Sequence, residues 1–304
     1  MTSNENSSFL RKLSMVAGSF LALFIFSFIP CCALASSEVV TSDHGFAERA
    51  FLISDNSGLL KIGNVRWGVK GKNPEQTPPE EHEFFWKDAT IRPELVEKIY
   101  FMVKPFTPKI IAGHGYSVML FKSGGIKGSE GSTPEGIVVS YEIFKQPGMK
   151  IKDIDFVYKA THDYYEVAPI VATWEDYVMA DCGLGKHELL PYEITFTREQ
   201  MIKFAESMLR AAASWQAHKE FYHTLKNSCV TKQVQGINSV IPDNQQIDPT
   251  LGQTKILNAN GFVPKLIAKT FEKKGIMSKC EPSITSKNFF IPLRKLLTTA
   301  KDSK

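Results

Sequence analysis

Residues 114–144 read HGYSVMLFK, SGGIKGSEGSTPEG and IVVSYEIF in succession, and they decide the class of fold. The outer segments are rich in β-branched and aromatic residues, which favour strands, whereas the middle one is a loop rich in glycine and serine. Two strands are therefore predicted, over 114–122 and 137–144. Successive side chains of a strand point to opposite faces, so the even-numbered residues of the first strand share one face. If the two strands pair, Glu142 lies within reach of His114.

The apolar periodicity becomes helical after residue 196. TREQMIKFAESMLRAAASW (197–215) opens with the Thr-x-x-Gln spacing of a capping box, and its apolar residues form one stripe. A second helix is predicted to begin at Asn227 or Ser228, and FVPKLIAKTFEKKG (262–275) predicts a third. Strands followed by helices indicate an α+β fold, in which an antiparallel sheet packs against helices.

Other segments have less regular patterns. RPELVEKIYFMVKPF (92–106) places apolar residues at helical spacing, which predicts a helix. DFVYKA (155–160) and YEITF (192–196) are expected to be strands, and 161–188 between them is expected to be a long loop insertion. FFIPLRKLLTTAKDSK (289–304) has some amphipathic character, and we interpret it as a surface or packing segment.

The N-terminus has the parts of an export signal. Arg11 and Lys12 form a short basic region, LSMVAGSFLALFIFSFIP (13–30) is an apolar stretch, and Ala33 and Ala35 are the small residues of a cleavage site. The apolar run is also long enough for an uncleaved membrane anchor, which is the alternative. The cleavage site favours an exported protein, processed after Ala35.

Charge and composition limit the choice of partners. The formal net charge is +4, and it falls to +3 without residues 1–35, which hold two basic residues and one acidic one. A charge this small does not indicate nucleic-acid binding. Basic residues gather towards the C-terminus, which favours peripheral contact of this tail with an anionic membrane surface. No later stretch is long and apolar enough to span a membrane.

The cysteines set Cys229 apart. Of five cysteines, Cys31 and Cys32 lie in the signal, so Cys182, Cys229 and Cys280 remain. An odd number in an oxidising compartment leaves at least one thiol free or intermolecular. A disulfide between Cys182 and Cys280 is a possible bridge that would leave Cys229 out, although the spacing alone does not establish it. No Cys/His spacing suggests zinc, and neither a metal nor a cofactor is expected.

The position of Cys229 suggests a nucleophile. If Asn227 or Ser228 is the N-cap, Cys229 lies in the first turn of a helix, where the dipole and the unpaired N–H groups favour a thiolate and can stabilise an oxyanion. The alternative is a cysteine that serves as a small buried apolar residue. A nucleophilic cysteine needs a base, usually histidine. His114 stands between two glycines in a predicted strand, and Glu142 on the next strand would orient its ring.

Several segments together resemble a known family. GHGYSVMLF, GIVVSYEIFK, DFVYKATHD and EFYHTLKNSCVT occur in this order, with the helix that YEITFTREQ opens before the last. They resemble the exported bacterial family named for the N-terminal periplasmic domain of Lnb, a lipoprotein N-acyltransferase, over residues 46–240. The family pattern F-Y-N-T-L-x-N-N-C-T-T is matched at Phe221, Tyr222, Thr224, Leu225, Asn227, Cys229 and Thr231. The chain departs from the family at His223, Ser228 and Val230, and at Phe144, where the pattern has an arginine.

The resemblance implies a papain-like fold in circularly permuted order, with the histidine strand before the cysteine helix. By motif, Cys229 would be the nucleophile, His114 the general base and acid, and Glu142 the orienting group. Asn227 and Ser228 would support the substrate or oxyanion beside the thiol. The implied activity is a periplasmic acyl transfer or hydrolysis at an ester or amide carbonyl of a lipid or lipoprotein.

Two other functions are kept as alternatives. Many permuted papain-like domains cut peptidoglycan, so a cell-wall peptidase or amidase is one. A non-catalytic envelope binding protein is the other, and it becomes preferable if Cys229 forms a disulfide or lies far from every histidine. The predicted organisation is a signal peptide over 1–35, the family domain over 36–241, and a helical C-terminal extension over 242–304.

Overall fold

The computed structural model describes residues 50–56, 58–70, 83–106, 113–144, 159–214, 220–248 and 263–302. The chain divides into two units, 1–39 and 40–304, and all the described residues belong to the second. The predicted signal peptide, its cleavage site and most of the expected strand at 155–160 lie outside the described residues.

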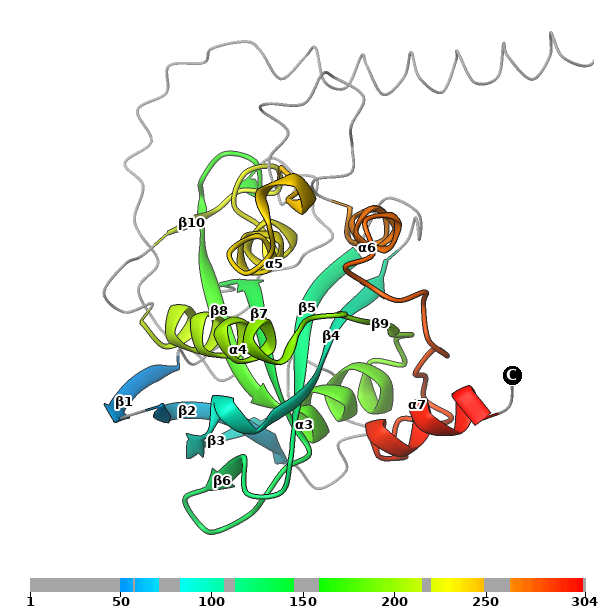
Figure 1. The fold of residues 1–304 in the computed structure, drawn as a ribbon. Helices are drawn as coiled ribbons and strands as arrows, with labels where there is room; N and C mark the ends of the chain where they lie inside the picture. The colour runs from blue at the N-terminus through cyan, green and yellow to red at the C-terminus, as the bar shows by residue number, and fades with distance from the viewer. Residues whose placement is uncertain are drawn as a thin grey trace, which may run out of the picture. The chain divides into compact units, whose positions relative to one another are not determined.

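Ten strands and five α-helices make up the described part of the chain (Figure 1). The strands are β1 (Phe51–Asn56), β2 (Leu59–Lys70), β3 (Glu83–Ile91), β4 (Val96–Pro105), β5 (Gly113–Phe121), β6 (Ile126–Gly128), β7 (Gly136–Ile143), β8 (Tyr165–Thr173), β9 (Leu190–Glu193) and β10 (Phe221–Tyr222). The helices are α3 (Trp174–Val178), α4 (Arg198–Ala213), α5 (Cys229–Asn238), α6 (Pro264–Lys273) and α7 (Leu293–Asp302). Two 3₁₀-helices, η3 (Pro93–Leu95) and η6 (Asp243–Gln245), and a π-helix, η4 (Met179–Leu184), complete the described elements.

The strands form one open sheet in the order β6-β3-β2-β8-β7-β5-β4-β9, with β1 paired to β2 and β10 paired to β8. The described pairs are antiparallel except β2 with β8, which pair in parallel where Arg66 meets Ala172. The fold is therefore α+β, as expected, but the sheet is mixed rather than antiparallel. The prediction of a purely antiparallel sheet missed this pairing because it joins strands about a hundred residues apart.

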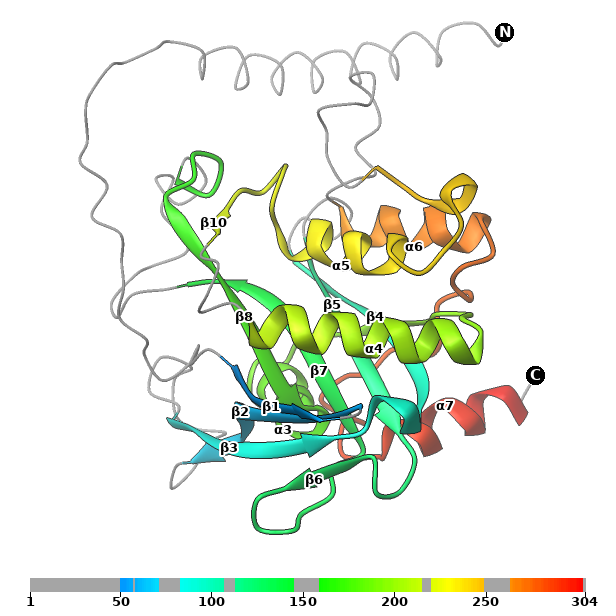
Figure 2. The same cartoon turned by 60° about the vertical axis from the view of Figure 1, so that its left-hand side comes forward.

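Helices cover both faces of this sheet, and each face has its own apolar core. Helices α4, α5 and α6 bury apolar residues together with the odd-numbered residues of β5, such as Met119. Helices α3 and α7 do so together with the even-numbered ones, Tyr116, Val118 and Leu120. Figure 2 shows α4 crossing in front of β8, β7 and β5. The predicted alternation along 114–122 is confirmed.

Local signals in the sequence locate three helices correctly. Helix α4 begins after Thr197, which forms the predicted capping box with Gln200. Helix α5 begins at Cys229 with Ser228 as its N-cap, and α6 occupies most of the third predicted helix. Each of these helices packs an apolar stripe on the sheet, and this burial adds to the capping bonds in stabilising them.

The secondary structure of two segments was predicted wrongly, and both segments contain strands that are buried on two faces. Residues 92–106 form η3 and then β4, which pairs with β5 on one side and β9 on the other. The supposed loop 161–188 contains β8, α3 and the π-helix. All nine residues of β8 are buried, so its sequence shows no alternation. Along one edge of β8, strand β10 pairs with Tyr165 and Glu166 and strand β2 pairs with Ala172. Pro169 lies between these two pairings, at a position where the missing N–H of proline is tolerated.

The C-terminal residues pack on the same sheet. Segment 277–284 follows the outer edge of β9, with bridges from Met277 to Ile194 and from Ile284 to Leu189. Helix α7 buries Leu293 and Leu297, so 289–304 is in part a packing segment and its centre is helical. No helix in the described ranges has the length and apolar character needed to cross a membrane.

Candidate active site

Cys229 is the first residue of α5, and a capping box holds it there. The hydroxyl of Ser228 accepts from the N–H of Thr231, and the hydroxyl of Thr231 accepts from the N–H of Ser228. In an α-helix the first N–H groups, here those of Cys229 and Val230, have no intrahelical acceptor. The thiol therefore stands at the positive end of the helix dipole, and it is 5 % exposed.

His114 and Glu142 meet where two strands stop pairing. Backbone pairing between β5 and β7 runs from Leu120–Gly136 to Ser117–Val139 and ends there, although both strands continue. Beyond this end, side chains replace backbone bonds. The Nε2 atom of His114 lies 2.8 Å from Oε1 of Glu142 and 2.7 Å from the hydroxyl of Ser140.

Tyr177 on α3 completes the support of this ring. Its hydroxyl donates to Oε1 of Glu142 at 2.7 Å and lies 3.1 Å from the Ser140 hydroxyl. Ser140 in turn donates to the same carboxylate oxygen at 2.8 Å. A carboxylate can only accept, so Nε2 of His114 carries the proton in its contact with Glu142. In a neutral ring this tautomer has its lone pair on Nδ1.

The Cys229 thiol has three hydrogen-bonding neighbours: the ring of His114, the backbone N–H of Gly115 and the hydroxyl of Tyr222. A Cβ atom added at Gly115 would lie 2.8 Å from the ring of Phe101 on β4. The packing of this ring against β5 therefore favours glycine at position 115.

The charges of the cluster favour a thiolate and an imidazolium. Burial by itself would raise the pKa of Cys229, but the charge and hydrogen bond of His114 and the N–H of Gly115 lower it below 9.0. Burial would lower the pKa of His114, but Glu142 and Cys229 raise it to about 10. For Glu142 the opposing effects are burial, which raises the pKa, and His114 with Lys104, which bring it well below 4.5. Each shift thus favours the charged form of its group, the thiolate of Cys229, the imidazolium of His114 and the carboxylate of Glu142.

A second buried pair lies beside the cluster. Lys104 is opposite His114 in the pairing of β4 with β5, and its ammonium lies 2.7 Å from Asp181 of the π-helix. The hydroxyl of Tyr116 donates to the other oxygen of Asp181 at 3.3 Å. A π-helix turn inserts an extra residue, and this one carries Asp181 against the sheet. The positive charge of Lys104 lowers the pKa of Glu142 and so helps to keep this carboxylate ionised.

Some predicted site residues lie elsewhere. The Asn227 side chain donates to Glu220 and to the carbonyl of Phe221, so it neither caps α5 nor faces the thiol. Ser228 has the extended backbone that a cap requires and takes that role instead. The possible disulfide is not formed: Cys182 and Cys280 are free thiols that contact the carbonyls of Ile284 and Glu281.

Sequence reasoning missed Tyr177, Tyr222 and the Lys104–Asp181 pair. Tyr177 and Asp181 fall in the segment that was interpreted as a loop. Lys104 falls in the segment that was interpreted as a helix. One signal in the sequence could have placed Ser140 at the site: Ser140 and Glu142 are two residues apart in a predicted strand, so they share one face.

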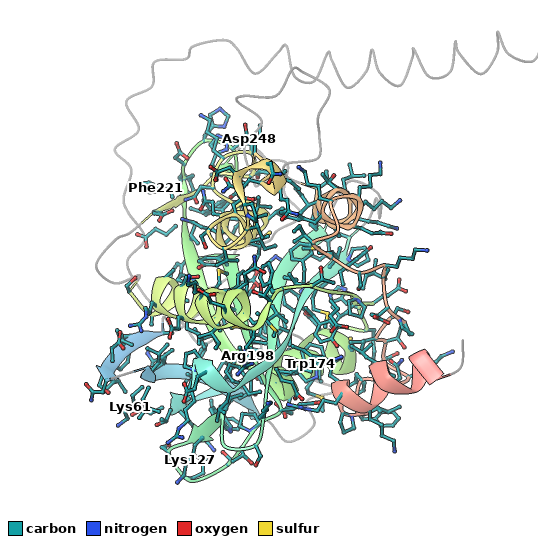
Figure 3. The ribbon with its side chains drawn as sticks, in the orientation of Figure 1. Lys61, Lys127, Trp174, Arg198, Phe221 and Asp248 are labelled. Carbon is teal, nitrogen blue, oxygen red and sulfur yellow. The ribbon has the colours of Figure 1, made fainter. Side chains whose placement is uncertain are left out.

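A groove of about 640 Å³ lies at the other end of β5. It is lined by Phe121, Trp174, Met179, Phe290 and neighbouring residues, and His114 is not among them. Figure 3 shows Trp174, which lines this groove, well away from Phe221 on β10. The groove is therefore separate from the cluster around Cys229. Within the described ranges, no group of three or more His, Cys, Asp or Glu side chains is arranged to hold a metal.

The fold and the cluster define a class of protein: an α+β domain with an open mixed sheet, in which a cysteine at the start of a helix meets a histidine and a carboxylate from two strands. The chain belongs to the family of the Lnb N-terminal periplasmic domain, whose model matches residues 86–260, more than half of its length. The match includes every residue of the cluster, and the family name indicates a periplasmic domain. The chain matches no curated protein and no solved structure.

Proposed function

We propose that this protein is a periplasmic enzyme in which Cys229 attacks an ester or amide carbonyl and transfers the acyl group to an amine or to water. The observation that carries the proposal is the placement of Cys229 at the start of α5, hydrogen-bonded to His114, whose other nitrogen lies 2.8 Å from Glu142. Thiol, imidazole and carboxylate in this order are the parts of a cysteine nucleophile with its base and orienting group.

In the first half-reaction the thiolate of Cys229 forms a bond to the carbonyl carbon, and the carbonyl oxygen becomes an oxyanion. The N–H groups at the start of α5 and the hydroxyl of Tyr222 would be donors to this oxygen. As the carbonyl collapses, the C–O or C–N bond breaks and the proton on Nδ1 of His114 passes to the leaving oxygen or nitrogen. A thioester on Cys229 remains.

In the second half-reaction an amine or a water attacks the thioester carbonyl. His114, now neutral, takes the proton of the attacking group, and the C–S bond breaks to release the product and the thiolate. Glu142 keeps the ring in one orientation and stabilises its charged form, with Ser140 and Tyr177 holding the carboxylate. This step makes the chemistry a transfer when the acceptor is an amine and a hydrolysis when it is water.

A lipid or lipoprotein is the proposed acyl donor, because the family is named for a domain of a lipoprotein acyltransferase. The C-terminal tail is proposed to touch the membrane surface. Phe290, just before α7, is 70 % exposed, and Lys295 on α7 is exposed as well. Exposed aromatic and basic residues together suit an anionic lipid interface. Co-sedimentation with anionic vesicles checks this membrane contact. The Phe290→Ser variant should bind the vesicles more weakly than the wild type.

Cell-wall peptide is the second candidate substrate. Phe221 and Tyr164 are 40 % and 49 % exposed, and each precedes one of the paired residues Tyr222 and Tyr165, of which Tyr222 interacts with the thiol. Exposed rings of this kind suit a peptide or glycan better than an acyl chain. The non-catalytic alternative is less favoured, because Cys229 is free and adjoins His114.

The test is to trap the thioester. The purified protein is mixed with acyl esters of increasing chain length and with a cell-wall peptide, and intact-mass and peptide mass spectrometry locate any acyl group. We expect a hydroxylamine-sensitive adduct on Cys229 that is absent from Cys229→Ser and slowed in His114→Ala. Cys182→Ser is the matched control, since that thiol is buried and burial raises its pKa to about 12. An adduct that forms equally in Cys229→Ser, or on no cysteine, overturns the proposal.

A further inference from the structure

Gln233 is a fully buried polar residue on the inward face of α5. It stands four residues after Cys229, which places both residues on the same face of the helix, one turn apart. Its neighbours along this face, Val230, Val234 and Ile237, are apolar and buried as well. A valine or leucine would continue that stripe at no hydrogen-bonding cost, so a buried amide here calls for an explanation.

The amide of Gln233 joins the two strands that carry the histidine and the carboxylate. Its Nε2 donates to the backbone carbonyl of Val139 on β7 at 2.9 Å, and its Oε1 accepts from the hydroxyl of Ser117 on β5. Ser117 and Val139 are the last residues that pair before β5 and β7 stop exchanging backbone bonds. The amide therefore closes the end of this ladder.

This end of the ladder is also the base of the candidate active site. His114 lies three residues from Ser117 along β5, and Glu142 lies three residues from Val139 along β7. Cys229 lies one helical turn from Gln233. One side chain thus ties together the three elements that hold the thiol, the imidazole and the carboxylate. Ser117 is fully buried and the other partner is the backbone carbonyl of Val139, so both hydrogen bonds of Gln233 are shielded from water.

We infer that Gln233 is a positioning residue: by bonding Ser117 and Val139 at the end of the β5–β7 ladder, it sets the height of α5 over the sheet and so the contact between Cys229 and His114. The inference rests on the proposed function. The contact between Cys229 and His114 must be tight, since the thiol interacts with the His114 ring and with the N–H of Gly115 at once. A shift of α5 by a fraction of an ångström weakens both contacts.

The test compares alkylation of single cysteines across pH. Wild type, Gln233→Met and Ser117→Ala are treated with iodoacetamide between pH 5 and 10, and mass spectrometry reads the rate at Cys229 and at the exposed Cys280 in the same sample. Methionine keeps the length and apolar volume of glutamine and removes both bonds. We expect the apparent pKa of Cys229 to rise by about one unit in Gln233→Met, which lowers its rate below that pKa roughly tenfold.

Gln200→Met is the matched control. Gln200 on α4 also donates its Nε2 to a backbone carbonyl, that of Val240, at 2.9 Å, but it lies away from the thiol. This variant should lose stability to urea and leave the pH profile of Cys229 unchanged. The double variant Gln233→Met/Ser117→Ala should have the profile of Gln233→Met alone, because Ser117 acts through the amide.

The outcomes separate the two proposals. If wild-type Cys229 has the same pH profile as Cys280, the proposed function fails. If wild-type Cys229 reacts as a low-pKa thiol and Gln233→Met keeps that profile, the inference about Gln233 fails alone. If Gln200→Met shifts the Cys229 profile as much as Gln233→Met does, loss of stability explains the effect and the inference is overturned.

Discussion

The charge of Glu142 should control the protonation of His114, and Glu142→Gln tests this. Glutamine keeps the shape of the side chain and an acceptor for Tyr177 while it removes the charge. Two unit charges 2.8 Å apart attract by about 6 kcal/mol at an effective dielectric constant of about 20. Burial of both groups offsets much of this, and a hydrogen bond to a charged group contributes about 1.5–3 kcal/mol net.

That net contribution corresponds to about one to two pKa units. The pKa of His114 is raised to about 10 in the wild type, with Glu142 the strongest of the raising influences. In Glu142→Gln it should therefore fall to about 8–9. Because a raised pKa stabilises the fold below the ordinary value of 6.5 and ceases to do so as pH rises through the raised value, the variant should also begin to lose stability at a lower alkaline pH than the wild type.

The assay is an NMR titration of the histidine ring protons, with the His114 signal assigned from its absence in His114→Gln. Urea unfolding at several alkaline pH values checks the linked stability. Glu175→Gln is the control: it removes an exposed carboxylate from the neighbouring helix α3, where Glu175 accepts from the N–H of Glu135 and not from His114. A His114 midpoint near 6.5 in the wild type, or one that Glu142→Gln leaves in place, would refute this account.

Three further predictions concern residues around the cluster. Ser228→Ala removes the N-cap of α5 and should lower the free energy of unfolding, measured with urea, by about 1 kcal/mol. Alkylation of Cys229, the next residue, should become slower in this variant. Gly115→Ala should cost about 1–3 kcal/mol in the same measurement, because the new methyl group meets the ring of Phe101. Tyr177→Phe removes a hydrogen bond that lowers the pKa of Glu142. A lowered carboxyl pKa stabilises the fold above its ordinary value of 4.5 and loses that effect as pH falls. Acid unfolding, followed by circular dichroism, should therefore move to higher pH in Tyr177→Phe, and an unchanged midpoint would contradict this.

The parts of the fold that the sequence predicts are those with a local cause. A Thr-x-x-Gln spacing at Thr197 and a cap beside Cys229 set the starts of α4 and α5 through bonds between residues close in the chain. Strand β5 alternates because its two faces meet different cores. These signals lie within a few residues of the element that they define, so they are readable without the fold.

The parts that it does not predict depend on pairing between distant segments. Strand β4 lies between two other strands, and β8 is buried throughout, so neither carries a period of two. Interpreting them as a helix and a loop hid Lys104 and Tyr177 from the site. The meeting of His114 with Glu142 was expected only if β5 and β7 paired, and the roles of Gln233 and Ser117 follow from where that pairing ends.

The edge of the sheet at β9 has a consequence for how the chain reaches its final form. Strand β9 is four residues long, and the segment that covers its outer edge comes about eighty residues later, at 277–284. In a chain delivered N-terminus first, this edge has unsatisfied backbone groups until the last part of the chain arrives. Open edges of this kind recruit other strands and lead to aggregation. The fold is therefore complete only when the last part of the chain has emerged. A chain truncated before residue 277 should aggregate through the exposed edge of β9.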